Sequence, residues 1–562
     1  MKADVVLLHA PAVFDFRERP RLWGPLADVI PSSAVFDMYP VGLTSLLDYL
    51  DRSGYRVILV NVANHVVSDP GYDVDAHLRR LAAPIFAIDL HWLPHAHGAL
   101  ELARRIKGIH PDAWVVLGGL SATYFHREIM ERYPQVDAVL RGDSTEAPMV
   151  ALADAIIRGT VPLAEVPNLS YRVPAGPARG EVRMNPMRHV PSDLAGIQVP
   201  AYDAVARAAL RQHSLLDVEP YHDWRRYPNT MLLTVRGCTE SCIACGGSRQ
   251  AYRRVCTREA PAFRSAQDLA RDVLMIERIS RHPIFVVGDP RIGGKQRWNE
   301  LLTLWGHHPP RNELVFELFG PADERFFQEL SAAVPRFSLE LSIESQDPAL
   351  RKINRKFGCS NDAVERTIRA ALASGARKLD LFFMVGISGQ TRASAAGIVP
   401  YAHSLVRALG EDRRFNPFVA PLGPFIDPGS TVWADAAYYG YRLFYRTLEE
   451  HRRALERRTW RGLLGYETLW LTRAEIVAAT YDVALGLNEL KASYGAVTAE
   501  EAAGVRQRTQ RELGLMDRYE AQEAGELALS AAGAPPGGDL LLGGSLCPPG
   551  ELTWKRGSRR RD

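Results

Sequence analysis

Two long blocks of this chain alternate short β-branched runs with helix-like segments, and this alternation constrains the fold more than any other feature. In residues 1–165, strands are expected at Val5–His9, Arg56–Asn61, Ile85–Leu90, Trp114–Leu117 and Ala138–Arg141, separated by helical patterns such as Leu43–Ser53 and Ala96–Ile109. From Tyr227 onward, strands are expected at 231–235, 284–287, 313–318, 337–343, 378–384 and 415–419. Such alternation predicts parallel sheets that bind ligands beyond the carboxyl ends of their strands. The chain is therefore predicted to be α/β.

Changes of composition along the chain predict the domain boundaries. Residues 1–165 are expected to form a doubly wound, Rossmann-like domain, and the proline- and glycine-rich stretch that follows predicts a linker over 166–226. The six strand–helix units of 227–433 predict an open, partial (β/α)6 barrel of the TIM type; one of its helices is expected to begin after Ser265, a favourable capping residue. Residues 434–515 have a charged, helical pattern, and 516–562 are predicted to be a disordered tail.

Three of the six cysteines lie within eight positions, directly after the strand expected at 231–235. Cys238, Cys242 and Cys245 have the spacing C-x3-C-x2-C and precede the turn Gly246-Gly247. Thiolates this close favour zinc or an iron–sulfur cluster. A structural zinc site takes a fourth protein ligand, whereas a three-cysteine cluster leaves one iron free for another molecule. The spacing favours an iron–sulfur enzyme over a zinc knuckle or structural thiols.

The remaining composition limits the partners and the compartment. A formal net charge of +3 over 562 residues gives no general attraction to nucleic acid, and the basic end at 555–561 is interpreted as part of the tail rather than as a nucleic-acid arm. The other cysteines are scattered, unlike a disulfide framework. No run approaches the roughly 18 apolar residues of a membrane span, and no cleavable signal follows the N-terminus. The predicted location is the cytoplasm, without membrane or nucleic-acid partners.

Further motifs follow the later strands of the second block. Phe285-Val286-Val287-Gly288-Asp289 ends the second strand, and Ser342-Ile343-Glu344-Ser345 ends the fourth, before Leu350-Arg351-Lys352-Ile353-Asn354-Arg355. The fifth ends in Gly386-Ile387-Ser388-Gly389-Gln390-Thr391. Together with the cysteine loop, these segments resemble the radical S-adenosylmethionine enzymes that carry an N-terminal cobalamin-binding domain, the class B methyltransferases in particular.

The resemblance implies three cofactors: a 4Fe-4S cluster, S-adenosyl-L-methionine and cobalamin. It assigns Cys238, Cys242 and Cys245 to the cluster. The residues it assigns to the organic cofactors are Gly288 and Asp289 (methionine amino group), Glu344, Ser345 and Arg355 (ribose region), and His91, Gly118, Gly119 and Ser121 (cobalamin). It also implies a small-molecule substrate and an electron donor such as flavodoxin or ferredoxin. No catalytic residue is assigned.

Three positions depart from the patterns of these relatives. Ala244 replaces the usual aromatic residue before the third cysteine, and Ser388 replaces the proline of G-x-P-G-Q-T, so adenine packing is expected to be rearranged. Asp89-Leu90-His91 is similar to the D-x-H-x-x-G motif that supplies a cobalt ligand, but it follows the third strand and has Pro94 in place of glycine. No histidine ligand to cobalt is therefore predicted, and His91, His95 and His97 are interpreted as polar loop residues near the corrin.

The leading functional hypothesis is a C-methyltransferase of specialised-metabolite biosynthesis that uses S-adenosylmethionine and methylcobalamin. The alternatives are a cobalamin-dependent radical cyclase or rearrangement enzyme, and a non-catalytic corrinoid-binding iron–sulfur sensor or carrier. Two side-chain groups remain open. Glu340 and Asp380 either face the barrel lumen or pair with basic neighbours. The tyrosines and arginines of 438–446 are interpreted as an amphipathic helix packed on the barrel rather than as a lid.

Overall fold

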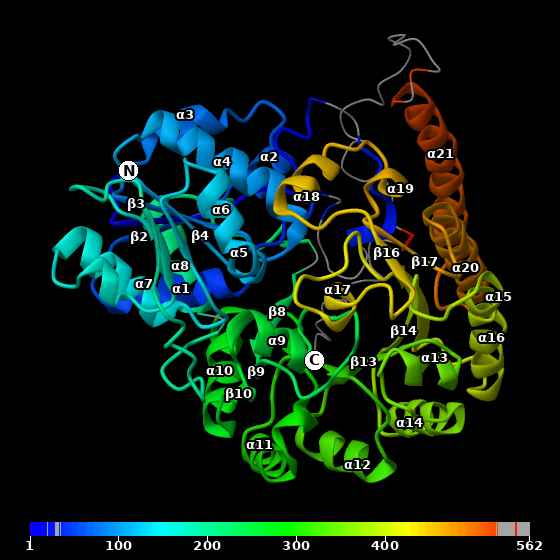
Figure 1. Cartoon of the computed structure of the whole chain (residues 1–562). Coiled ribbons are helices and arrows are strands. Elements are labelled where there is room, and N and C mark those ends of the chain that lie inside the picture. The colour runs from blue at the N-terminus through cyan, green and yellow to red at the C-terminus, as the bar shows by residue number, and fades with distance from the viewer. Residues whose placement is uncertain are drawn as a thin grey trace.

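The computed structural model describes residues 1–18, 21–27, 33, 35–199, 201–226, 228–523, 525 and 546–547. Its first domain is built on a sheet of order β2-β1-β3-β4-β5-β6-β7 (Figure 1). The first five strands are parallel: β1 (Val5–His9), β2 (Val57–Asn61), β3 (Ile85–Asp89), β4 (Trp114–Gly118) and β5 (Ala138–Leu140). All five match the predicted strands to within one residue at each end, so the expected strands are confirmed.

Helices cover both faces of this sheet, because alternate strand residues point to opposite sides. Val5 and Leu7 belong to one apolar core, and Val6 and Leu8 to the other. The helices that follow the strands are α1 (Gly42–Arg52), α2 (Val62–Ser68), α3 (Val74–Arg80), α4 (Ala96–Ile109), α5 (Leu120–Tyr124), α6 (His126–Arg132) and α7 (Glu146–Ala153). Since β1 pairs with β2 on one side and β3 on the other, the order of the sheet reverses between β1 and β3, where such folds bind ligands.

The segment predicted as a linker is largely structured. Strands β6 (Leu169–Arg172) and β7 (Val182–Met184) extend the first sheet with antiparallel pairing, and α8 (Tyr202–Gln212) packs on α1 and β2. The proline- and glycine-rich composition that suggested a linker belongs to the turns between these elements. The first structural unit therefore continues to about residue 220.

The second sheet has six parallel strands in the order β15-β14-β13-β12-β11-β8. They are β8 (Thr230–Leu233), β11 (Ile284–Val287), β12 (Leu314–Leu318), β13 (Phe337–Glu344), β14 (Leu379–Val385) and β15 (Phe415–Pro421). Helices α9 (Arg249–Cys256), α10 (Ala266–Ile279), α11 (Lys295–His307), α12 (Glu324–Ala333), α13 (Pro348–Ile353), α14 (Asn361–Ala373), α15 (Arg392–Ala396) and α16 (Ile398–Ala408) connect them. The Ser265 side chain caps α10 as predicted. Because β8 and β15 are the two edges, this is the predicted open, partial barrel.

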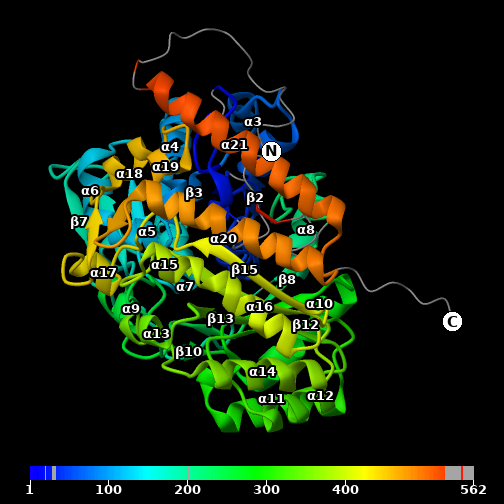
Figure 2. The ribbon, with the colours of Figure 1, turned by 90° about the vertical axis from the view of Figure 1, so that its right-hand side faces the viewer.

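The C-terminal region closes the barrel edge and returns to the first domain. Helix α20 (Arg473–Ser493) lies along β15, and α21 (Ala499–Glu523) packs on α20 (Figure 2). Before them come α17 (Thr431–Ala434), β16 (Tyr441–Leu443), α18 (Leu448–Ala454), α19 (Trp460–Leu463) and β17 (Tyr466–Thr468). Helix α18 packs on α4 of the first domain.

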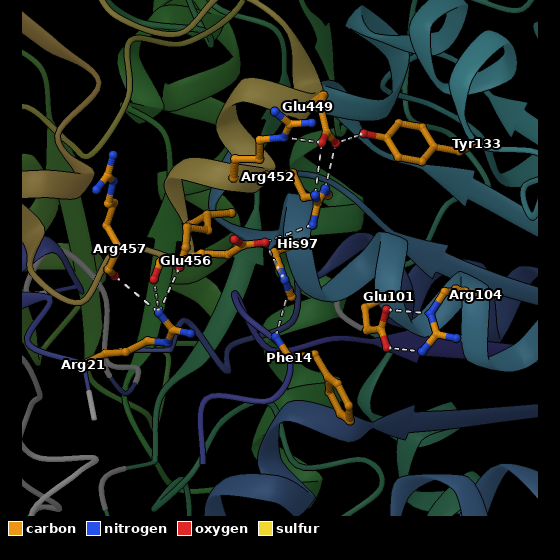
Figure 3. Close-up of polar contacts among 12 residues, drawn as sticks. Phe14, Arg21, His97, Glu101, Arg104, Tyr133, Glu449, Arg452, Glu456 and Arg457 are labelled. Atoms are coloured by element: carbon orange, nitrogen blue, oxygen red, sulfur yellow. Dashed lines mark hydrogen bonds and ion pairs between the residues drawn. The ribbon is translucent and has the colours of Figure 1, made fainter. Parts of the chain in front are cut away.

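A set of polar contacts fastens α18 to the first domain (Figure 3). The Tyr133 hydroxyl donates to Glu449 at 2.7 Å, and Glu449 also pairs with Arg452 at 2.7 Å. His97 accepts a hydrogen bond from the Phe14 N–H and lies 3.6 Å from the Glu456 carboxylate. The first domain is thus held by the C-terminal region as well as by the barrel.

Two predictions about the C-terminal half need correction. The tyrosine-rich segment 438–446 is not an amphipathic helix: Tyr441 begins strand β16, which pairs antiparallel with β17. Helix α21 runs to Glu523, past the boundary predicted at 515. The rest of the predicted tail, apart from residues 525, 546 and 547, lies outside the described residues. Within the described chain, none of the helices has both the length and the apolar character that a membrane crossing requires.

Candidate active site

The three cysteines lie on one loop at the carboxyl end of the first barrel strand, between β9 (Val235–Arg236) and α9. Backbone N–H groups of Glu240 and Gly247 donate to the sulfurs of Cys238 and Cys245 at 3.3 and 3.2 Å. The middle of the loop is fixed from two sides, because the Ile243 N–H donates to Asn354 and the Ile243 carbonyl accepts from Val432. All three thiols are free. The sequence therefore folds locally into a preformed three-thiol site.

The spacing of these thiols fits an iron–sulfur cluster better than a single zinc ion. Thiolates bound tetrahedrally to one zinc lie only about 3.8 Å apart. Among the described residues, the three cysteine sulfurs do not all lie within 4.8 Å of one another. A wider separation suits a cluster in which each thiolate binds a different iron. Burial raises the pKa of the Cys242 thiol to about 11, so a metal centre must displace the proton for Cys242 to act as a ligand.

Gly288 and Asp289 lie at the carboxyl end of β11. Gly288 has φ +85°, and its N–H donates to the Glu317 carboxylate at 3.3 Å. The Asp289 carboxylate is almost fully buried and accepts from the Arg291 guanidinium at 2.8 Å and from the Phe319 N–H at 2.9 Å. The Asp289 side chain therefore fixes this turn, which leaves the backbone of the turn for contact with a cofactor.

The residues assigned to the ribose region differ in their surroundings. Glu344 ends β13 with φ +65° and forms an ion pair with Lys356 at 3.0 Å. Burial would lower the pKa of Lys356, but the Glu344 charge and the nearby Cys242 raise it overall. The buried Ser345 hydroxyl accepts from the Asp347 N–H at 3.1 Å, which is a structural role. Arg355 is exposed and donates to the Tyr439 hydroxyl at 3.2 Å.

The hydrogen bonds of Ser388 explain why this position does not hold proline. Its N–H donates to the Asn354 side-chain oxygen at 3.2 Å, which a proline could not do, and its carbonyl accepts from the Asn354 amide at 2.9 Å. The Ser388 hydroxyl donates to the Tyr439 carbonyl at 2.7 Å. Asn354 also accepts, through its backbone carbonyl, from Ile243 of the cysteine loop. Ser388 thus belongs to the network that fixes the cysteine loop.

Strand residues of one parity line the barrel lumen. Leu233, Val287, Ser342 and Met384 are only half-buried, whereas their neighbours of the other parity pack against the helices. Glu317, Glu340, Asp380 and Asn416 are aligned in register across β12 to β15. Asp380 pairs with Lys378 at 2.9 Å and accepts from Asn416 at 2.7 Å.

Glu340 is the unusual member of this row. Burial, together with the neighbouring charges of Asp380 and Glu317, raises the pKa of Glu340 well above its ordinary value. A raised pKa lets a carboxyl group keep its proton to higher pH, and a protonated carboxyl can donate a hydrogen bond to a ligand in the lumen. Both interpretations from the sequence apply: Glu340 and Asp380 share the lumen-facing parity, and Asp380 also pairs with the basic Lys378.

In the first domain, polar side chains gather where the sheet order reverses. At the ends of β1 and β3, the His9 Nδ1 lies 2.8 Å from the Asp89 carboxylate, and the His95 Nε2 donates to the Phe36 carbonyl at 2.8 Å. The second Asp89 oxygen and the His95 Nδ1 are buried without a hydrogen-bond partner among the described residues. These atoms could meet the amide side chains of a corrin ring. His97 instead faces Phe14 and Glu456, away from this edge.

The four residues assigned to cobalamin lie at the adjacent carboxyl ends of β3 and β4: His91 follows β3, and Gly118, Gly119 and Ser121 lie at or just after the end of β4. The Ser121 hydroxyl and N–H both reach the His91 carbonyl, at 3.0 and 3.1 Å. Gly119 has φ +105°, and a side chain there would place its Cβ 2.6 Å from the His91 Cα, so only glycine fits. The structure therefore brings His91, Gly118, Gly119 and Ser121 together at the ligand-binding edge.

The carboxyl edge of the first sheet and the mouth of the barrel meet at a buried ion pair. Glu146, which begins α7 after β5, bonds to Arg236 with one contact at 2.8 Å, and both side chains are more than nine-tenths buried. Arg236 lies two residues before Cys238 in the chain. A second buried pair joins Asp143 to Arg258 beyond the cysteine loop. The carboxyl edge of the first sheet is thus fastened directly to the mouth of the barrel.

Comparison with known proteins agrees with this geometry. Residues 28–152 match the B12 binding domain, and residues 232–399 match the Radical SAM superfamily. The chain therefore carries a B12-binding domain followed by a radical SAM domain. This confirms the predicted fold class and the predicted set of cobalamin, S-adenosylmethionine and a 4Fe-4S cluster.

The architecture of most of the chain matches a solved structure. The radical S-adenosylmethionine methyltransferase TsrM from Kitasatospora setae, with cobalamin and a [4Fe-4S] cluster bound, superimposes with a TM-score of 0.57 at 15% identity, over 86% of this chain and 88% of that chain. The same protein with tryptophan substrate and a SAM analogue gives a TM-score of 0.56 at 14% identity, over 85% and 88% of the two chains. At this identity, the likeness establishes the fold.

A relative with a similar sequence aligns with a smaller part of this chain. An uncharacterized methyltransferase of Pyrococcus horikoshii, PH0819, is 30% identical over 158 residues, which is 28% of this chain. The chain spans 30% of the length of that relative.

Proposed function

We propose that this chain is a cobalamin-dependent radical S-adenosylmethionine methyltransferase that methylates carbon in a small molecule of specialised metabolism. The Glu146–Arg236 ion pair carries the proposal, because it fixes the carboxyl edge of the first sheet, through the segment after β5, against the cysteine loop. When bound, the three cofactors would supply the electron and the methyl group. The names of PH0819 and TsrM, both methyltransferases, support the same reaction class.

The chain's own residues would bind, orient and shield the reactants. Cys238, Cys242 and Cys245 would hold the cluster, and the Gly288 turn and Glu344 would position S-adenosylmethionine beside it. His91, Gly118, Gly119 and Ser121 would contact cobalamin at the facing edge. The lumen, closed at the β15 edge by α20, would exclude water from the reacting groups. An electron donor of the flavodoxin or ferredoxin type would reduce the cluster.

The test of this proposal is transfer of a labelled methyl group. Reconstituted protein is incubated anaerobically with methyl-labelled S-adenosylmethionine, a reductant and a metabolite extract of the source cells. The proposal expects a new labelled small molecule that depends on added cobalamin. Consumption of S-adenosylmethionine to deoxyadenosine, with an unlabelled new product, would instead identify a cyclase or rearrangement enzyme.

We expect Glu340 to lower the stability of the folded chain at pH 7 and to contribute to substrate binding. Its pKa is raised in the folded chain, so its contribution to stability is complete below the ordinary glutamate pKa and is lost as the pH rises toward the folded value. Glu340→Gln removes this cost and should raise the melting temperature at pH 7 but not at pH 4, while KM for the substrate rises.

Asp380→Asn is the matched control for this prediction. It lies in the same row but breaks the ion pair with Lys378, so it should lower the melting temperature at pH 7. If Glu340→Gln also lowers the melting temperature at pH 7, the assignment of Glu340 as a buried lumen acid with a raised pKa is wrong.

A further inference from the structure

A second group of metal-binding side chains lies in the first domain, outside the site described above. It consists of His65 on α2, His77 on α3 and Asp217 in the segment after α8. All three residues are buried, and one potential ligand atom from each lies within 4.8 Å of the other two. Helices α2 and α3 both lie in the upper part of the first domain in Figure 1. The chain therefore brings three separate segments together at one point.

Each of these side chains is oriented by a neighbour, as is usual for metal ligands. The Tyr72 hydroxyl bonds to the His77 Nδ1, and the Tyr72 ring stacks on the His65 ring with centroids 4.6 Å apart. The Gln212 amide donates to one Asp217 oxygen at 3.1 Å, which leaves the other oxygen 2.6 Å from the His65 Nε2. The atoms directed into the cluster are thus two imidazole nitrogens and a carboxylate oxygen.

The His77 Nε2 is the atom that points to a missing ligand. It is buried, the residue is only 7% exposed, and the nitrogen has no hydrogen-bond partner among the described residues. Because Tyr72 occupies the Nδ1, the Nε2 is the nitrogen left to bind something else. An unpaired buried polar atom costs about 1–3 kcal/mol, and coordination to a metal ion would remove that cost.

We propose that His65, His77 and Asp217 bind a divalent first-row transition metal, of which zinc(II) is the natural probe. Two imidazoles and one carboxylate suit ions of this class and are poor ligands for calcium or magnesium. Three protein ligands leave one position of a tetrahedral ion for water. The ion would cross-link α2 and α3 to residue 217, and so hold the segment that leads into the barrel against the first domain.

The test measures the metal content of the full-length protein, reconstituted with its cluster and cobalamin and then equilibrated with zinc(II) and passed over a desalting column. Elemental analysis separates zinc from the iron of the cluster and the cobalt of cobalamin. The expected result is about one zinc per chain. Zinc should be lost in His77→Gln and in Asp217→Asn, while iron and cobalt contents stay at the wild-type level and so show that these variants fold. Tyr72→Phe, which removes an orienting group, should weaken zinc binding by roughly tenfold.

Two controls separate this site from its alternatives. His126→Gln changes a half-buried histidine of the same domain that bonds to Ser170, and it should keep its zinc. The Cys238→Ala/Cys242→Ala/Cys245→Ala variant should also keep it, which excludes zinc held by the cysteine loop. The proposal is overturned if wild-type protein holds no zinc, or if His77→Gln and Asp217→Asn retain it. None of these outcomes depends on methyl transfer, so the two proposals fail or succeed separately.

Discussion

Replacing Cys238, Cys242 and Cys245 together by alanine is expected to abolish iron binding, the visible absorbance of the cluster and all cleavage of S-adenosylmethionine. The three thiols are the metal-binding groups of this loop, and the loop itself is held by backbone contacts to Asn354 and Val432 that the substitutions leave in place. Cobalamin should still bind in unchanged stoichiometry, because its proposed contacts lie on a different sheet. The measurement is iron and cobalt per chain, with the absorbance spectrum of each reconstituted protein.

Cys359→Ala is the matched control for the cysteine triplet. Cys359 is a free, half-buried thiol, and its backbone carbonyl accepts a hydrogen bond from the Arg351 guanidinium at 2.7 Å. This variant should keep the full iron content. If the triple variant lost cobalamin together with iron, the picture of two separate sites would be wrong.

Arg236→Met is expected to destabilise the junction of the two domains strongly. It leaves the Glu146 carboxylate buried without its partner, which typically costs about 3–5 kcal/mol in the free energy of unfolding. The double variant Arg236→Met/Glu146→Gln should lose clearly less, because no unpaired charge remains. The two free energies are measured by urea unfolding, and methyl transfer should fall in both variants as the edges separate.

The same ion pair predicts a pH dependence. Burial alone would raise the pKa of Glu146, but Arg236 and the Ser45 hydroxyl lower it below the ordinary value. The stability it contributes is therefore present above the unfolded glutamate pKa of about 4.3 and is lost as the pH falls through the lower folded value. Wild-type protein should lose stability more steeply than Glu146→Gln below about pH 4.3. Equal slopes would show that Glu146 is not ionised in the fold.

Periodicity in the sequence was enough to predict most of the fold. Strands such as β1, β11 and the helix α4 have the predicted ends, because β-branched runs and helical spacing act locally. The segment after β5 was harder, since β6 and β7 are short and are stabilised by pairing with the existing sheet. The tyrosine-rich segment was predicted as a helix for the same reason: its strand β16 exists only through pairing with β17, more than twenty residues away.

Some residues of the candidate site could be predicted from the sequence, and others could not. The cysteine spacing is a local signal and identified the loop, whereas Arg236 and Glu146 lie ninety residues apart and nothing in either segment shows that they meet. Asp289 and Ser345 were predicted as cofactor contacts from their motifs, but their side chains are occupied by the turns that hold the site. Lys356 was missed because a basic residue beside Arg355 has no distinguishing pattern until Glu344 is placed next to it.

The most direct test of the proposed reaction needs no knowledge of the substrate. Protein loaded with its cluster and cobalamin is incubated under reducing conditions with S-adenosylmethionine that carries a deuterated methyl group, and the corrinoid is then extracted and weighed by mass spectrometry. If the B12-binding edge and the barrel mouth cooperate as proposed, the deuterated methyl group is recovered on the corrinoid. Arg236→Met should reduce that recovery. Corrinoid that stays unlabelled while S-adenosylmethionine is consumed would contradict methyl transfer through cobalamin.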